Sequence, residues 1–332
     1  MYFTLDNQAK FTEIINNLTV EESIPFREYL ENSGTTAFII IHGNELIYEN
    51  YFNGFGHEDT LTTFSISKSF LSTLVGIAIT EGYINSIDDV ITSYIPELRE
   101  RDAKFSEITI RHLLTMSSGI KYQNYFSPWS DPSKTYYAPD LRDTALNCEI
   151  LEVPGQRFLY NNYNPLLIGL VLESATGIPV AEYMETRLWQ PMGAESGGSW
   201  SLDSTRSGFE KMESGINGKA IDIAKLGWLF INNGRNGDVQ VVPREWIEEA
   251  TKRDDTNDPA LFYQYFWWVD NEIEAYWAEG NFGQGLYIYP EQQLVLLRMG
   301  KESGNTTWTP DFLRSLAQWL EINFNEIQAP PE

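Results

Sequence analysis

The sequence predicts an α+β fold, in which one antiparallel sheet is built from both ends of the chain and a mostly helical region is inserted between them. Runs rich in β-branched and aromatic residues occur near the start and again after about residue 262. Between them, apolar residues recur at helical spacing. We therefore expect residues 1–60 and 241–332 to form a sheet region and residues 61–240 a helical region, together one compact unit.

The first part of the sheet is expected to be a hairpin. The dense apolar run 37–41 and the run 46–52 are separated by a turn containing Gly43 and Asn44. Because residues 37–41 do not alternate with polar residues, this strand should be covered on both faces. Two short helices should precede it, over residues 11–18 and 26–30.

The helical region is expected to open with a long helix from Phe64 to Thr80, ended by Gly82. Thr109 is a candidate N-cap for a helix over residues 108–116. Apolar spacing or helix start signals predict the remaining helices over residues 85–98, 165–176, 181–189, 220–231 and 243–252.

Residues 121–140 predict a long loop that holds six aromatic side chains among Pro, Ser, Asp and Asn. We give equal weight to two interpretations, a lid or binding loop and a surface loop held by its own aromatic residues. After this region the strand pattern returns. Four strands and a final helix are predicted, over residues 265–269, 275–278, 284–290, 294–299 and 310–324.

Composition narrows the possible partners. The formal net charge of −24 argues against binding nucleic acid or an anionic membrane surface, and it weakly favours neutral or cationic substrates. The single cysteine, Cys148, excludes an intramolecular disulfide. The first residues do not resemble a secretory leader, and no run approaches the roughly 18 apolar residues of a membrane span. We therefore expect a cytoplasmic protein without a membrane partner; its oligomeric state is not predicted.

Several common catalytic and binding motifs are absent from the sequence. It contains no G-x-S-x-G nucleophile elbow, H-E-x-x-H zinc motif or G-x-x-x-x-G-K-[ST] phosphate loop. Gly280 to Gly285 does not match the dinucleotide spacing. His42, His57 and His112 lie in no recognisable acid–base or metal context, so structural roles are favoured for all three. We therefore predict no metal and no cofactor.

A Ser-x-x-Lys pattern is the strongest remaining candidate, and it occurs twice, at Ser65/Lys68 and Ser118/Lys121. Residues three apart share one helix face. A lysine amine that is removed from water can take the proton of a serine hydroxyl and so activate it. Ser65 stands at the head of the predicted buried helix, whereas Ser118 precedes a glycine at a helix end. The alternative interpretation of Ser65 is an N-cap, with Lys68 in solvent.

Tyr-x-Asn, a second short pattern, occurs five times and is uninformative alone. Only Tyr160 lies in a turn bounded by Pro and Gly just before an apolar helix.

Taken in order, four segments resemble the serine β-lactamase and penicillin-binding-protein superfamily. The similarity is greatest to the class C β-lactamase-related branch of esterases, D-aminopeptidases and 6-aminohexanoate-dimer hydrolases, and it extends over about residues 35–325. It implies a β-lactamase/transpeptidase-like fold. The segments are residues 64–70, 108–119, 154–164 and 280–290.

The resemblance implies roles for four residues. Ser65 would be the acylated nucleophile and Lys68 its proton partner. Tyr160 would be the second base and acid, held near the serine by Lys68. Asn162 would position the substrate or the lysine.

The family's third motif, Lys/His-Thr/Ser-Gly, is replaced by Ala278-Glu279-Gly280. The usual cation that would bind a substrate carboxylate is absent, and Glu279 adds a negative charge on the substrate side. The strand at Gly280 would supply a backbone N–H near Asn281, which with that of Ser65 would bind the oxyanion. Tyr122, in the aromatic loop, is assigned to the substrate side.

We therefore expect a serine hydrolase that cleaves small-molecule esters or amides through an acyl-enzyme on Ser65. One alternative is a β-lactamase or a D-amino-acid peptidase or carboxypeptidase. A second is a non-catalytic binding domain of the penicillin-binding type, supported only by the altered third motif.

Overall fold

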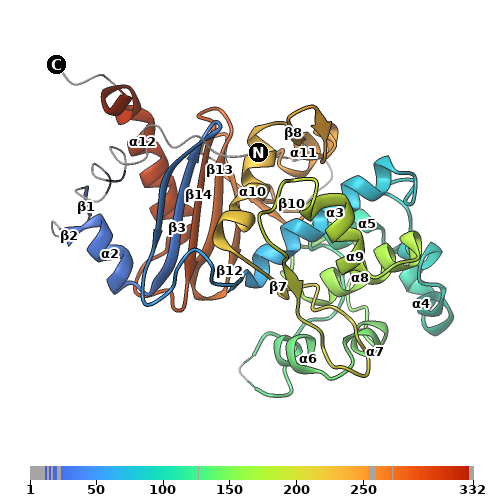
Figure 1. Ribbon diagram of the computed structural model, residues 1–332. Helices are drawn as coiled ribbons and strands as arrows, with labels where there is room; N and C mark the ends of the chain where they lie inside the picture. The colour runs from blue at the N-terminus through green and yellow to red at the C-terminus, as the bar shows by residue number, and fades with distance from the viewer. Residues whose placement is uncertain are drawn as a thin grey trace.

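Seven antiparallel strands from both ends of the chain form the central sheet of the protein, seen in a computed structural model (Figure 1). The structure describes residues 12, 15, 18–20, 24–125, 127–253, 259–270 and 272–328. The strand order is β10-β11-β12-β13-β14-β3-β4. The strands are β3 (Thr35–His42), β4 (Glu45–Tyr51), β10 (Tyr263–Gln264), β11 (Trp267–Val269), β12 (Tyr276–Gly280), β13 (Gln284–Tyr289) and β14 (Leu294–Gly300).

Strand β3 joins the two ends of the chain and is buried on both faces. It pairs with β4 across the predicted hairpin and with β14 on its other side, where Leu297 lies opposite Ile39. Phe38 packs into one core with helices α2 (Phe26–Asn32) and α12 (Leu313–Gln328), and Ile39 packs into the other with α10 (Ala220–Ile231). Figure 1 shows these helices on opposite faces of the sheet. The predicted fold class and the two-sided burial of this strand are confirmed.

The segment between the two parts of the sheet is mainly helical and lies beside the sheet in Figure 1. Its longest helices are α3 (Ser67–Thr80) and α8 (Tyr163–Thr176), which contact each other. The shorter helices are α4 (Pro96–Arg101), α5 (Ile110–Leu114), α6 (Asp131–Tyr137), α7 (Leu141–Leu146), α9 (Val180–Met184) and α11 (Arg244–Ala250). Short 3₁₀ or π turns in this segment are η2 (Phe64–Ile66), η3 (Ile91–Ser93), η4 (Ala103–Glu107) and η5 (Glu185–Trp189). Two more lie in the C-terminal part of the sheet region, η6 (Asn281–Gly283) and η7 (Trp308–Phe312).

Small strand pairings complete the fold. In one three-stranded sheet, the central strand β7 (Ile216–Gly218) pairs with β5 (Leu61–Thr62) and β6 (Ser199–Trp200). This pairing brings the chain around residue 216 to the start of the first long helix. The other pairs are β1 (Thr19–Val20) with β2 (Ile24–Pro25) and β8 (Arg235–Asn236) with β9 (Val239–Gln240).

One helix prediction and one loop prediction are wrong in part. Residues 85–98 were expected to form one helix, but they form turns before α4 begins at Pro96. The Asp89 carboxylate accepts hydrogen bonds from the Asn85 and Ser86 N–H groups and from the Tyr94 hydroxyl, which closes a turn. The second half of the loop predicted over residues 121–140 is helix α6.

One strand prediction is also wrong. Residues 265–269 were expected to form one strand, but β10 and β11 are separated by a tight turn at Tyr265 and Phe266. Both residues have positive φ, 34° and 66°. The Phe266 backbone is held by a hydrogen bond from its N–H to Leu114 O and by one from Ser69 Oγ to its carbonyl. This conformation is rare for aromatic residues, so contacts distant in sequence impose it.

Most of the helix predicted over residues 11–18 lies outside the described residues. Within the described ranges, no single helix has the length and apolar composition needed to cross a membrane; one pair, residues 163–176 and 180–189, passes that test only jointly and is bent by 74°.

Candidate active site

Ser65 lies in the 3₁₀ turn η2, directly before helix α3, rather than in the first turn of the helix itself. Phe64 has a positive φ of 47°. The turn is fixed from outside, because Thr63 N donates to Ile216 O and Ile216 N donates to Ser67 Oγ. The pairing of β5 with β7 therefore determines where the Ser65 side chain lies.

Lys68 points back from α3 to Ser65, as the predicted spacing requires. Its Nζ lies 2.9 Å from Ser65 Oγ and 2.9 Å from the backbone carbonyl of Glu213. The lysine is 1% exposed. Burial lowers the pKa of Lys68 to about 7, an effect that the Glu213 carboxyl partly opposes. A substantial fraction of the amine is therefore neutral near pH 7 and able to accept a proton.

Tyr160 comes from the turn before α8 and joins the same cluster. Its phenol lies near the Ser65 side chain, and burial raises the pKa of Tyr160. Lys68 Nζ lies 5.0 Å from the centre of its ring. Trp268 stacks on the Tyr160 ring, with ring centres 6.0 Å apart. The phenol therefore keeps its proton at neutral pH and can pass it on.

The end of β12 packs against the serine. A Cβ atom at Gly280 would lie 2.7 Å from Thr63 O and 3.0 Å from Ser65 N, so only glycine fits at this approach. Asn281 follows in the exposed turn η6. The Glu279 carboxylate is half-buried and accepts hydrogen bonds from Trp277 Nε1 at 3.1 Å and Thr309 Oγ1 at 2.7 Å.

Asn162 and Tyr122 lie at the edge of this cluster. Asn162 Oδ1 is buried without a hydrogen-bond partner among the described residues, and the Lys68 amine donates to Ser65 and Glu213 instead. The Tyr122 hydroxyl lies near the Asn162 backbone and the side chain of Thr135. Its ring lies edge-on to Tyr163, with centres 6.1 Å apart.

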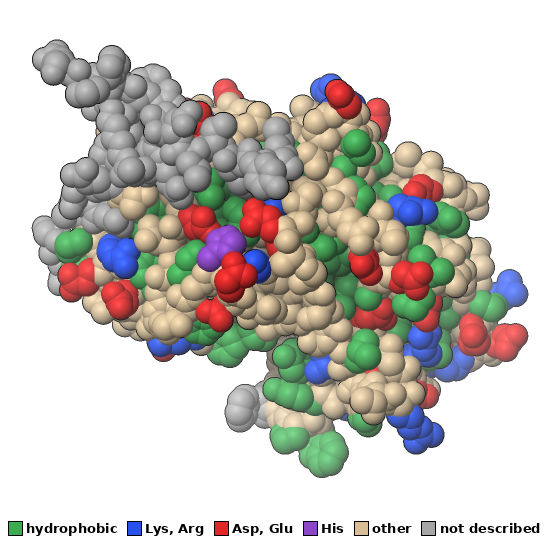
Figure 2. Space-filling view, viewed as in Figure 1, with side chains coloured by type: hydrophobic (Ala, Val, Ile, Leu, Met, Phe, Trp, Pro, Cys, Tyr) green, Lys and Arg blue, Asp and Glu red, His purple; other side chains and the backbone are tan. Residues whose placement is uncertain are grey.

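Other aromatic residues of the loop are exposed, although Tyr136 is half-buried beside Lys211. Trp129 and Tyr137 are each 76% exposed. Figure 2 shows hydrophobic side chains gathered at the end of the molecule where α6 lies. Of the aromatic residues described in this loop, Tyr122 is the one that reaches toward Tyr160.

Glu213 belongs to the cluster but was not predicted from the sequence. It is 1% exposed, its carbonyl accepts from Lys68, and its carboxyl oxygen Oε2 has no hydrogen-bond partner among the described residues. Because Glu213 closely follows two other charged residues, Glu210 and Lys211, the local sequence indicates an exposed position. No local signal marks its burial, which follows from the pairing of β7 with β5.

The second Ser-x-x-Lys pair is separated in space. Ser118 Oγ donates to Asn164 Oδ1 at 2.6 Å. Lys121 instead forms a partly exposed ion pair with Glu149 at 2.8 Å. His112 completes the capping box of α5 by accepting from the N–H of the predicted N-cap, Thr109. His112 therefore has a structural role in stabilising the start of α5.

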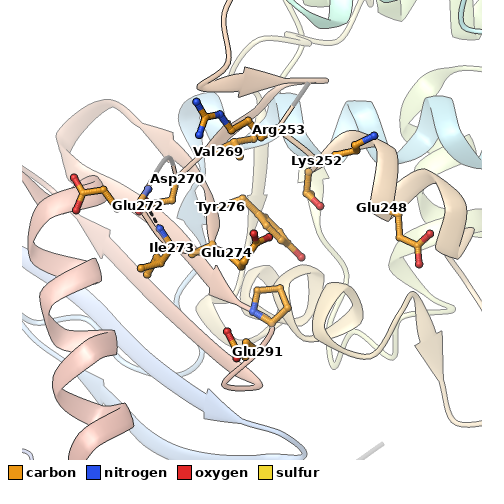
Figure 3. A pocket seen from close by; sticks show the side chains of 13 residues that line it. Glu248, Lys252, Arg253, Val269, Asp270, Glu272, Ile273, Glu274, Tyr276 and Glu291 are labelled. Atoms are coloured by element: carbon orange, nitrogen blue, oxygen red, sulfur yellow. Dashed lines mark hydrogen bonds between the residues drawn. The ribbon is translucent and has the colours of Figure 1, made fainter. Parts of the chain in front are cut away.

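A cavity of about 500 Å³ lies near the opposite end of β12 from Gly280 (Figure 3). Its lining includes Glu248, Glu272, Glu274 and Tyr276, but none of Ser65, Lys68 and Tyr160. It is therefore separate from the serine cluster. Within the described part of the chain, no group of three or more His, Cys, Asp or Glu side chains is arranged to hold a metal ion.

Comparison with known proteins gives consistent matches. A family model described as Beta-lactamase matches residues 26–311. The 6-aminohexanoate-dimer hydrolase of Paenarthrobacter ureafaciens is 28% identical over 292 residues, covering 81% of this chain and 73% of that protein. Esterase EstB of Burkholderia gladioli is 31% identical over 162 residues, which cover 45% of this chain and 41% of the esterase.

A solved structure supports the same fold. A Bacillus anthracis protein described provisionally as a 6-aminohexanoate-dimer hydrolase superposes with a TM-score of 0.82 at 23% identity. The match covers 96% of this chain and 87% of that one. The predicted β-lactamase/transpeptidase-like fold is therefore confirmed.

Proposed function

Because this chain belongs to the Beta-lactamase family, we propose that it is a serine hydrolase that cleaves ester or amide bonds of small molecules through an acyl-enzyme on Ser65. The observation that carries the proposal is the 2.9 Å contact between Ser65 Oγ and the amine of the buried Lys68. A serine becomes nucleophilic when a neighbouring base can take its proton, and burial makes this lysine such a base.

In the first half of the reaction, Ser65 Oγ attacks the carbonyl carbon of the substrate and its proton passes to the neutral amine of Lys68. The carbonyl oxygen becomes an oxyanion beside the Ser65 N–H and the end of β12. The tetrahedral intermediate then collapses, and Tyr160 gives its proton to the leaving alcohol or amine while it regains one from Lys68. The product is an ester between the acyl group and Ser65.

In the second half, water attacks the acyl-enzyme. Its proton passes to the Tyr160 and Lys68 pair, and Ser65 Oγ leaves with a proton from the same pair. The acid is released and the starting protonation is restored. No metal or other cofactor is invoked, because proton transfer and oxyanion binding account for each step.

The charge at the third motif bears on the substrate. Ala278 stands where the family motif carries a cation, and two hydrogen bonds fix the carboxylate of the neighbouring Glu279 just before Gly280. A substrate carboxylate would be repelled there, whereas a protonated amine would be attracted. We therefore assign neutral or amine-bearing esters and amides as substrates in preference to anionic ones. The linear 6-aminohexanoate dimer named for one relative carries such an amine at one end and a carboxylate at the other, so only its amine end would be attracted to Glu279.

A substrate panel tests the proposal. A p-nitrophenyl ester, a linear 6-aminohexanoate dimer, a D-amino-acid dipeptide and a chromogenic cephalosporin are incubated with wild type, Ser65→Ala and Ser118→Ala. We expect wild type and Ser118→Ala to hydrolyse the ester or the amide, and Ser65→Ala to be inactive. Hydrolysis that survives in Ser65→Ala would overturn the proposal, whereas turnover of the cephalosporin or dipeptide alone would favour the β-lactamase or peptidase alternative.

A further inference from the structure

Glu213 combines deep burial with an incompletely satisfied carboxyl group. Its Oε1 accepts a hydrogen bond from Ser214 Oγ at 2.8 Å, while Oε2 is buried with no partner among the described residues. A buried polar atom without a partner is costly, so structures retain one mainly where it serves a purpose. The same residue provides the carbonyl that holds the Lys68 amine.

The position of Glu213 relative to the serine is fixed by backbone pairing. Two hydrogen bonds join the segment that follows Glu213 to the segment around Ser65. Thr63 N donates to Ile216 O, and Ile216 N donates to Ser67 Oγ. Thr62 also pairs with Asn217 in the β5–β7 ladder. The segment that carries Glu213 therefore has little freedom to move away from Ser65 and Lys68.

The groups around the Glu213 carboxyl come from four parts of the chain. Its charge acts on Lys68 of α3, on Tyr160 and on Tyr136 of α6. Lys211, which precedes it by two residues, acts on Glu213 in turn and lies with Nζ 4.4 Å from the Tyr136 ring centre. Burial raises the pKa of Glu213, whereas the two lysines lower it.

We propose that Glu213 is a positioning residue of the reaction: its carbonyl orients the Lys68 amine toward Ser65, and its buried carboxylate stabilises the protonated form of that amine. The inference rests on the proposed function of Ser65 and Lys68. During acylation the serine proton moves to Lys68, so an ammonium forms in an interior from which water is excluded. A nearby carboxylate favours that ammonium and makes Lys68 a stronger base than burial alone would leave it.

Replacing the Glu213 carboxyl group tests this role. The quantity measured is the pH dependence of kcat/KM for a p-nitrophenyl ester. In Glu213→Gln the amide keeps the size of the side chain and the backbone carbonyl but removes the charge. We expect the rise of kcat/KM with pH to move to lower pH by roughly one pH unit, because Lys68 loses its proton more easily. The plateau above that rise should fall as well, because the base is weaker. A side chain that only maintains packing would lower the plateau without moving the rise.

Two further variants complete the experiment. Glu210→Gln is the matched control, because Glu210 is a buried acid on the same segment whose Oε1 accepts from Ala181 N instead; its profile should coincide with that of wild type. Ser214→Ala removes the donor to Oε1 and should move the rise in the same direction as Glu213→Gln, by a smaller amount. It keeps the test decisive if Glu213→Gln does not fold by circular dichroism.

The two possible failures are distinguishable. An active wild type whose pH profile is unmoved in Glu213→Gln, or in Ser214→Ala where that variant must be used, would overturn the role of Glu213 alone. A wild type that neither hydrolyses the ester nor reacts with a fluorophosphonate would overturn the proposed function and this inference with it.

Discussion

The amine of Lys68 lies 2.9 Å from the hydroxyl oxygen of Ser65 while the lysine side chain is almost fully buried. Burial of an ammonium is unfavourable, so the neutral form of Lys68 gains relative to its form in water. The fold therefore brings a hydroxyl and a base together where water cannot compete for the proton. Three predictions concern this pair and Tyr160, and two concern the end of β12.

The first prediction is a pH profile. Below its pKa of about 7, Lys68 is protonated and has no lone pair for the serine proton; above it, the amine is neutral. The kcat/KM for a neutral ester should therefore rise with pH, with its midpoint near 7, when measured from pH 5.5 to 9. A profile that is flat or falls across that range would show that Lys68 is not the base.

The second prediction concerns Lys68→Met, which replaces the amine with an uncharged chain of similar length. Loss of the general base should reduce kcat/KM by about 10²- to 10⁴-fold. The melting temperature should fall somewhat, because the Glu213 carbonyl loses its donor and the buried Glu213 carboxyl loses a nearby cation. Lys121→Met is the matched control from the second Ser-x-x-Lys pair and should keep full activity. An active Lys68→Met protein would contradict the assignment.

Tyr160→Phe removes the hydroxyl group and keeps the aromatic ring. The stacking on Trp268 is retained, so the fold should persist, but proton delivery to the leaving group is lost. We expect kcat to fall by roughly 10²- to 10⁴-fold. Tyr276→Phe is the control, since Tyr276 is a buried tyrosine whose hydroxyl has no hydrogen-bond partner among the described residues. Equal activity in the two variants would remove Tyr160 from the mechanism.

Glu279→Gln tests the charge preference. Two amides that share an acyl group, one with a terminal amine and one with a terminal carboxylate, are compared by their kcat/KM ratio. The ratio should fall roughly tenfold in the variant, which corresponds to about 1.4 kcal/mol, as expected for loss of one charge contact. Glu149→Gln, at a distant exposed ion pair, should leave the ratio unchanged. An unchanged ratio in Glu279→Gln would exclude contact between this carboxylate and the substrate.

Gly280→Ala tests the close approach of β12 to the serine. The added methyl group would meet Thr63 O at 2.7 Å, so the strand must move away from Ser65 N. We expect at least a tenfold loss of kcat with a smaller change in KM, because the oxyanion is bound in the transition state. Gly197→Ala has no neighbouring atom within 4 Å of the new Cβ and should be neutral. Similar kinetics in both variants would argue against an oxyanion site at this position.

Local patterns in the sequence were sufficient for much of the fold. The hairpin after residue 35 follows from apolar runs around a Gly-Asn turn, and the bounds of α10 agree with its helical spacing. Thr109 caps α5 as predicted. In the site, the Ser65 and Lys68 spacing marked one of two candidate pairs, and the resemblance of four ordered segments to a known superfamily was needed to add Tyr160; the structure brings all three together.

Features that depend on distant contacts were not predictable. The turn at Tyr265 and Phe266 contains no glycine, and hydrogen bonds from Ser69 and to Leu114 hold it. Glu213 is buried because residues that follow it pair with a strand about 150 residues earlier in the chain. Neither feature leaves a periodic pattern. Both lie where separate segments meet, and this is also where the candidate active site is assembled.

The most direct test of the central claim is the site of covalent labelling by a fluorophosphonate. The intact mass of the labelled protein and the mass of its proteolytic fragments identify the modified serine. We predict a single adduct on Ser65, absent from Ser65→Ala and formed much more slowly in Lys68→Met. An adduct that persists in Ser65→Ala, or that maps to Ser118 or another serine in wild type, would contradict the account.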